Sequence, residues 1–170
     1  MGTPYGEIGV VNAMNNDMKN KMRQKVKTLF NYWHNITLPS NYNVVSLPGE
    51  SFDFETHVAD RAGKKNQNEN LLLWMYENDS KLHNKFKKTV EKHGKDSGHT
   101  FLYLRENVPP ISSFKVLPTF AWYDFCGNPT KQRFNCLYNK DVNKNTVAVV
   151  TYNTRTRLHK HLHPMVMPHL

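Results

Sequence analysis

The chain has 170 residues, of which 38% are hydrophobic and 12% aromatic, so it can bury the core of one domain of ordinary size. Lys and Arg number 23 against 14 Asp and Glu, and the formal net charge of +9 fits a polyanionic partner such as nucleic acid as well as a merely solubilising basic surface. Two cysteines do not make a disulfide framework, and no apolar run approaches about 18 residues, which excludes a membrane-spanning helix. Since no signal-like segment follows Met1, we expect a reducing intracellular compartment such as the cytoplasm, in a host cell if the protein is viral.

The first 38 residues predict an arm and a basic helix. Residues 1 to about 12 carry Gly2, Pro4 and Gly6 and predict an irregular arm. From Ala13 to His34 apolar residues recur every three or four positions, which predicts a helix with one buried stripe. The other face carries basic residues, among them Lys19, Arg23 and Lys27. We expect these three to contact the phosphates of a nucleic acid; a solvated basic face is the alternative.

A strand, a tight turn and a helix are predicted next. Val44 to Leu47 form a short apolar run that Pro48 and Gly49 break, and a helix is predicted from about Phe54. Such a junction directs backbone N–H groups and the helix dipole at whatever lies above the end of the strand. A single glycine is a weak signal, since any α/β turn can contain one.

Two further strands and a helix follow in the middle of the chain. Leu71 to Tyr76 is the most apolar run, and its continuous rather than alternating character predicts burial on both faces, as in a parallel sheet. Asp79 or Ser80 is predicted to cap a helix that stops at Gly94. Thr100 to Arg105 predicts the third strand.

The fourth strand is predicted to end in a polar motif. Phe120 to Tyr123 is a short aromatic run, and Asp124 to Pro129 then combine an acid, a thiol and an amide with residues that break regular structure. Thr146 to Tyr152 is β-branched and predicts a fifth strand. Polar groups at the carboxyl ends of buried strands lie where open α/β sheets bind ligands.

Strands that alternate with helices predict βαβ units and a mostly parallel α/β sheet with helices on both faces. The succession resembles the Rossmann-like core of the S-adenosylmethionine-dependent methyltransferases over roughly residues 40 to 157. This resemblance, to a shortened or degenerate member of viral or phage type, implies about five strands, with the first and fourth side by side and the usual C-terminal strands lacking. We divide the single domain into an arm and helix (1–38), the core (39–157) and a His-rich basic tail (158–170).

The resemblance also implies a cofactor site. Its cofactor loop would be formed by Leu47, Pro48, Gly49 and Glu50, where most members of the family have several glycines. Glu77, followed by Asn78, stands where the family keeps the acid that bonds the ribose hydroxyls of S-adenosylmethionine. Capping of the adjoining turn or helix is the structural alternative for Glu77.

The fourth-strand motif of the family corresponds to Asp124 and Phe125, which lack the Pro-Pro of the amino methyltransferases. Asp124 would orient the cofactor amine or the substrate, or else cap a turn; Phe125 would stack on a base, or else pack in the core. Val147 to Arg155 matches the fifth strand with its polar trail, and we expect Arg155 and Arg157 to contact nucleic acid.

The resemblance therefore implies a methyltransferase acting on or near nucleic acid, in which a substrate nucleophile attacks the methyl group of the sulfonium in line. The alternative is a nucleic-acid-binding or assembly protein that keeps the fold without catalysis. A shortened sheet leaves an edge to be covered, so we expect a homo-oligomer or a larger complex. No metal site is expected at His159, His161 and His163, because no spaced pair of cysteines accompanies them.

Overall fold

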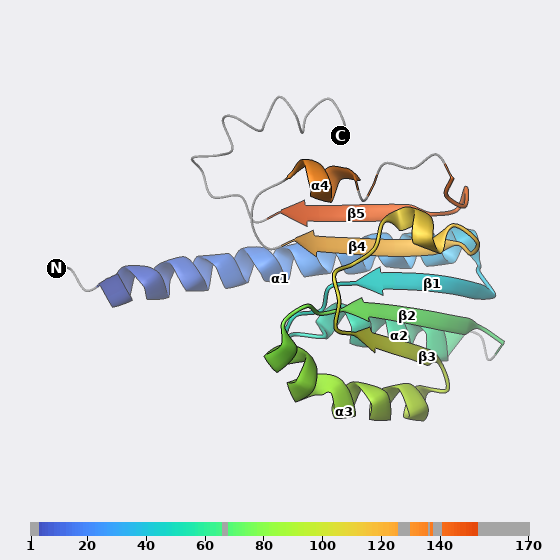
Figure 1. Cartoon of the computed structure of the whole chain (residues 1–170), viewed down its shortest axis with the longest axis horizontal. Helices are drawn as coiled ribbons and strands as arrows, with labels where there is room; N and C mark the ends of the chain where they lie inside the picture. Colours follow the sequence, from blue (N-terminus) through green and yellow to red (C-terminus); the bar gives the residue numbers. More distant parts are fainter. Residues whose placement is uncertain (1–3, 66–67, 126–129, 136, 138–140, 153–170) are drawn as a thin grey trace.

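The computed structural model describes residues 4–65, 68–125, 130–135, 137 and 141–152, which build one five-stranded, all-parallel sheet flanked by helices (Figure 1). The strands are β1 (Asn41–Ser46), β2 (Asn70–Tyr76), β3 (Thr100–Leu104), β4 (Thr119–Phe125) and β5 (Val147–Tyr152). The helices are α1 (Pro4–Thr37), α2 (Asp53–Lys65), α3 (Ser80–Ser97), the 3₁₀ helix η1 (Ile111–Phe114) and α4 (Lys131–Asn135). The Rossmann-like α/β class predicted from the sequence is confirmed.

The strand order is β3-β2-β1-β4-β5, so the chain moves outward from β1 to β3 and then returns to the other side of β1. β1 pairs with β2 from Asn41↔Asn70 onward and with β4 from Asn43↔Thr119 onward. The predicted contact between the first and fourth strands is thereby confirmed. Because all strands are parallel, their carboxyl ends meet at one edge of the sheet, which we call the carboxyl edge.

One face of the sheet, the helical face, is covered by α1, α2 and α3 (Figure 1). The buried residues of α1 include Val26, Phe30 and Trp33, which follow the predicted spacing of three or four. Phe30 makes edge-on contacts with Phe54 of α2 and Phe120 of β4, at ring-centroid distances of 6.0 and 5.3 Å. Aromatic packing therefore joins two helices to the central strands.

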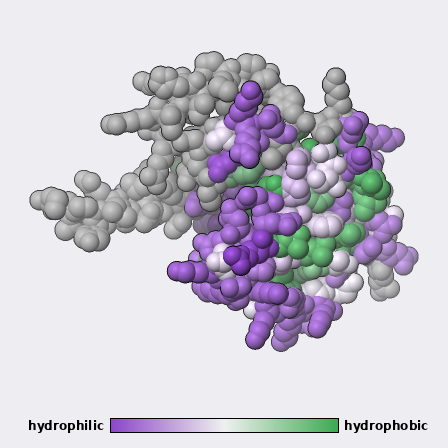
Figure 2. All heavy atoms as spheres, viewed as in Figure 1, coloured by the Kyte–Doolittle hydropathy of each residue, from purple (hydrophilic) through white to green (hydrophobic). Residues whose placement is uncertain are grey.

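The opposite face is covered by the segment that runs from β3 to β4 and contains η1. Phe114 of η1 packs edge-on against Trp74 of β2 with ring centroids 5.5 Å apart. The Trp74 indole N–H donates to the Asn43 side-chain oxygen at 2.9 Å, which satisfies a polar group in the middle of the sheet. Figure 2 shows apolar side chains at the surface of this face between hydrophilic margins, and Val116 after η1 is 80% exposed. This face is thus more thinly covered than the helical face, which carries the three long helices.

Three element boundaries differ from those predicted. α1 already begins at Pro4, where the expectation was an irregular arm; a proline fits the first turn of a helix because its missing N–H has no partner there anyway. β4 does not stop at Asp124, because Asp124 and Phe125 still pair with Thr151 and Tyr152 of β5.

α3 likewise passes Gly94, the predicted stop, and is capped by Gly98 with φ of 73°. Gly94 is needed inside the helix, since a Cβ there would lie 3.0 Å from Cβ of Phe101 on β3. The glycine that ends this helix is therefore the one with left-handed backbone, and the earlier one permits close approach to the sheet.

A buried polar network anchors the C-terminal end of α1. His34 is fully buried, and its Nε2 contacts the carboxylate of Glu69, which precedes β2. Arg61 of α2 donates its Nε–H to Nδ1 of His34 at 3.2 Å. Since Nδ1 accepts, we assign the proton of His34 to Nε2, from where it is donated to Glu69. The network thus joins α1, α2 and the entry to β2 through one imidazole.

Replacing Glu69 by Ala should lower the free energy of unfolding by about 1–3 kcal/mol, because it removes the carboxylate that accepts from the buried Nε2–H of His34. Urea denaturation followed by circular dichroism measures the change. The matched control is Asp17→Ala, which removes the exposed Lys21–Asp17 pair of 3.2 Å and should cost under about 1 kcal/mol. Equal effects of the two substitutions would contradict the anchoring role.

Candidate functional site

The turn from β1 to α2 reaches the carboxyl edge with two residues of positive φ, Gly49 at 59° and Phe52 at 48°. A Cβ on Gly49 would meet nothing within 4 Å, so the backbone conformation and not crowding requires the glycine. The Phe52 ring packs on Phe86 and Tyr103, with centroids 5.1 and 5.8 Å away, and this packing holds its unfavourable conformation. Of the predicted loop residues, Pro48 is buried, Leu47 and Gly49 are half-buried and Glu50 is exposed.

Glu77 follows β2 and is half-buried. One carboxylate oxygen accepts the backbone N–H of Asp79 at 3.0 Å, and Asp79 in turn caps α3 by accepting from the N–H groups of Lys81 and Leu82. The neighbouring Asn78 is exposed and donates to Asn107 at 3.0 Å. Glu77 therefore has the capping role considered from the sequence, while its other carboxylate oxygen has no hydrogen-bond partner among the described residues.

Asp124 lies at the end of β4 with its carboxylate exposed on the helical face. It accepts a hydrogen bond of 2.6 Å from the hydroxyl of Thr151 on β5, and that hydroxyl also accepts from the Trp122 indole at 3.1 Å. Phe125 points to the opposite face, because successive residues of a strand alternate. There it is buried against Tyr152, and the Arg133 guanidinium lies 5.1 Å from its ring centroid. The structure thus separates the two predicted catalytic residues across the sheet.

The strand order brings the other predicted groups together. The end of β1 lies between those of β2 and β4, so its turn is flanked by Glu77 on one side and Asp124 on the other. Successive strands are added on one side of β1 up to β3 and on its other side from β4 on, and ligands of open α/β sheets bind at such a switch point. No protein-family model, curated protein or solved structure matches the chain.

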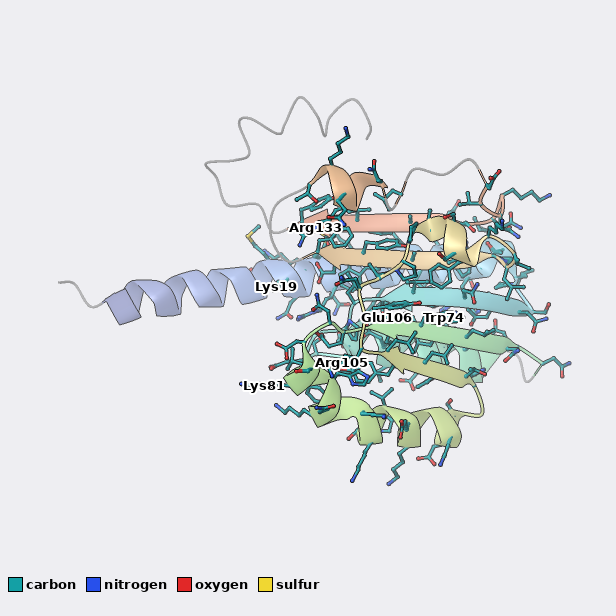
Figure 3. The ribbon with its side chains drawn as sticks, viewed as in Figure 1. Lys19, Trp74, Lys81, Arg105, Glu106 and Arg133 are labelled. Atoms are coloured by element: carbon teal, nitrogen blue, oxygen red, sulfur yellow. The ribbon has the colours of Figure 1, made fainter. Side chains whose placement is uncertain are left out.

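Basic side chains frame the carboxyl edge. Figure 3 shows four of them, from different elements: Lys19 of α1, Lys81 of α3, Arg105 after β3 and Arg133 of α4. Lys19 joins the group because the N-terminal half of α1 extends past this edge (Figure 1). These cations share the edge with acids, among them Glu77, Asp124 and Glu106. The turn between them exposes backbone N–H groups, which favour anions.

The remaining basic residues predicted to bind nucleic acid have other positions. Lys27 forms an ion pair of 2.7 Å with Asp53 at the start of α2, and its side chain is only 15% exposed. Arg23 donates to the side chain of Asn20 at 2.8 Å on α1. Arg155 and Arg157 lie outside the described residues, as does the His-rich tail. Of the predicted set, Lys19 is thus the exposed member that lies beside the candidate site.

The described part of the chain contains no group of three or more His, Cys, Asp or Glu side chains that could hold a metal ion. None of its helices combines the length and the apolar character that crossing a bilayer needs.

Sequence reasoning missed Glu55, whose side chain is buried on the helical face at 5% exposure. Burial raises its pKa from 4.5 to about 7, against the smaller opposing effects of its own backbone N–H and the Ser46 hydroxyl. Its charge helps to raise the pKa of the buried Tyr103 hydroxyl to about 12, after burial itself and Glu77. No sequence signal separates Glu55 from Asp53, because an acid in the first turn of a helix normally faces solvent and interacts with the dipole.

Glu55→Gln should stabilise the protein above neutral pH. A carboxyl with a higher pKa in the folded state binds its proton more tightly there, so the wild type loses stability as the pH rises from 4.5 to about 7, and the loss levels off above that pH. At about 1.4 kcal/mol per pKa unit, the free energy of unfolding of the variant, relative to that of the wild type, should rise by up to about 3 kcal/mol from pH 4 to pH 8. Urea denaturation at both pH values measures this gain, and the exposed Glu50→Gln is the control that should show none.

Proposed function

We propose that the carboxyl edge binds S-adenosylmethionine and that the chain is a methyltransferase-like protein acting on or near nucleic acid. The observation that carries the proposal is the position of Glu77 at the end of β2, beside the turn that follows β1. A nucleoside laid across a switch point presents its ribose hydroxyls to an acid at the end of the second strand. The carboxylate oxygen of Glu77 that does not accept from Asp79 can accept a hydrogen bond from such a hydroxyl.

The remaining residues of the edge fit the other parts of this cofactor. The backbone at Gly49, with open space where a side chain would stand, permits close approach of a ligand to the turn. Asp124 offers an exposed carboxylate to an ammonium group, with Thr151 fixing its orientation. When bound, the cofactor would supply the sulfonium methyl group and its leaving group, so the protein would have only to orient the two reactants and exclude water.

The basic frame supports a nucleic-acid substrate. Lys19, Lys81 and Arg105 are exposed and surround the same edge as Glu77. Phosphate contacts from separate elements would hold a strand in register over the edge, because they position a nucleic acid without reading its bases. A function without catalysis, in which this frame only binds nucleic acid, is the second candidate.

Isothermal titration calorimetry with S-adenosylmethionine tests the cofactor. Glu77→Gln should weaken binding at least about tenfold, since hydrogen bonds to charged groups are worth about 1.5–3 kcal/mol. The variant should stay folded because the amide oxygen of Gln can still accept from Asp79. The matched control is Glu106→Gln, an exposed acid beyond the end of β3 on the same edge, which should leave the affinity unchanged (Figure 3).

No binding of the cofactor to the wild type at millimolar concentration would overturn the methyltransferase proposal and favour the function without catalysis. Equal binding by the wild type and Glu77→Gln would show that the cofactor uses another site.

Fluorescence anisotropy with a short duplex at several salt concentrations tests the nucleic-acid surface. The triple variant Lys19→Ala, Lys81→Ala, Arg105→Ala should reduce the slope of log affinity against log salt by about 2 to 3, since each phosphate contact contributes about 0.9. The control removes the same charge from the middle of α3: Lys87→Ala, Lys88→Ala, Lys92→Ala, three exposed residues that lie away from the edge. Equal reductions would indicate attraction by total charge instead of a surface at the carboxyl edge.

A further inference from the structure

A cavity of about 410 Å³ lies between α2 and α3 on the helical face, away from the switch point between β1 and β4. Its floor is formed by Leu73 and Met75 of β2 and Phe101 of β3, and Phe86 and Val90 of α3 line one wall. This volume is within the range of about 300–1,000 Å³ that small-molecule sites occupy. Apolar and aromatic walls would bury the body of a ligand.

The charged groups that line the cavity are all acidic, in a protein of net charge +9. Glu55 lies in the wall at 5% exposure, while Asp60 and Asp96 are exposed. His93 also belongs to the lining, and no Lys or Arg does. The cavity lining thus carries negative charge although the protein as a whole is positive, and a negative lining favours a cationic ligand.

Glu55 lacks the ionic partner that a buried carboxylate normally has. None of the ion pairs formed by the described residues includes it, and the charge of Arg23 acts on it only weakly. Asp53, the other acid that acts on it, has the same sign. A buried carboxylate without a counter-ion is costly, and a ligand cation would remove that cost.

We propose that the cavity between α2 and α3 binds a small hydrophobic amine, with the ammonium group paired to Glu55 and the apolar body against Leu73, Met75 and Phe101. Phe52 and Phe86, whose rings pack edge-on with centroids 5.1 Å apart, also line the cavity and add to its apolar wall. The cavity lies under the two helices, whereas the proposed cofactor site lies outside the strand ends; Phe52, in the turn after β1, borders both.

The test is titration of ¹⁵N-labelled protein with 2-phenylethylamine near pH 8, followed by two-dimensional NMR. Near that pH most of Glu55 is ionised, since its pKa is about 7, and the probe is protonated. Two probes of matched shape, neutral 2-phenylethanol and anionic phenylacetate, separate the effect of charge from that of the ring. We expect the amine to bind most tightly and to shift the amides of Thr89, Val90 and Phe101.

Glu55→Gln should weaken binding of the amine at least about tenfold, while binding of the neutral alcohol should change little. The matched control is Glu91→Gln, an exposed acid of α3 that does not line the cavity and should bind as the wild type does. Ala59→Leu, which adds bulk to the wall, should abolish binding of both probes; its thermal melt shows whether it remains folded.

Three outcomes would overturn the proposal. The alcohol could bind as tightly as the amine, or Glu55→Gln could bind the amine as the wild type does; either result would make the cavity an apolar site without preference for a cation. Shifts confined to the turn after β1 and to Glu77 would place the amine at the carboxyl edge instead. Since S-adenosylmethionine binding is measured separately, failure of either proposal leaves the other standing.

Discussion

The buried network at His34 is the constraint on which the arrangement of the molecule depends. Arg61, His34 and Glu69 connect α2, the end of α1 and the entry to β2 in the interior, where a missing partner is costly. With its C-terminal end held there, α1 crosses the helical face and runs past the opposite edge of the sheet (Figure 1). The anchor at one edge therefore determines that Lys19 reaches the other.

The sheet order has a comparable influence on the candidate site. Because β4 returns to the free side of β1, the turn after β1 is flanked by polar groups from two other strands. The connections also place the three long helices on one face of the sheet and the short η1 on the other. Glu77 and Asp124 thus come to one edge from positions 47 residues apart in the chain, whereas Phe125, next to Asp124, is turned to the opposite face.

The acidic residues show how differently one side-chain type is used. Asp53 pairs with Lys27, Asp79 caps α3, and Asp124 accepts from Thr151, so each of these carboxylates is neutralised or hydrogen-bonded near the surface. Glu55 is buried without an ionic partner, and its pKa is raised to about 7 as a result. A bound cation would stabilise this buried carboxylate, so the proposed amine site connects ligand binding with the stability of the fold.

The sequence by itself determined the class of fold, the alternation of strands and helices, and the positions of Glu77 and Asp124 at strand ends, because these depend on local periodicity and on residues that break it. It did not determine where β4 ends, since pairing with β5 extends it through Phe125, nor that Gly94 lies inside α3 against Phe101. The burial of Glu55, the partner of Lys27 and the cavity between α2 and α3 were also decided only by tertiary structure. Each depends on which side chains distant in sequence face one another, and no pattern within a single element carries that information.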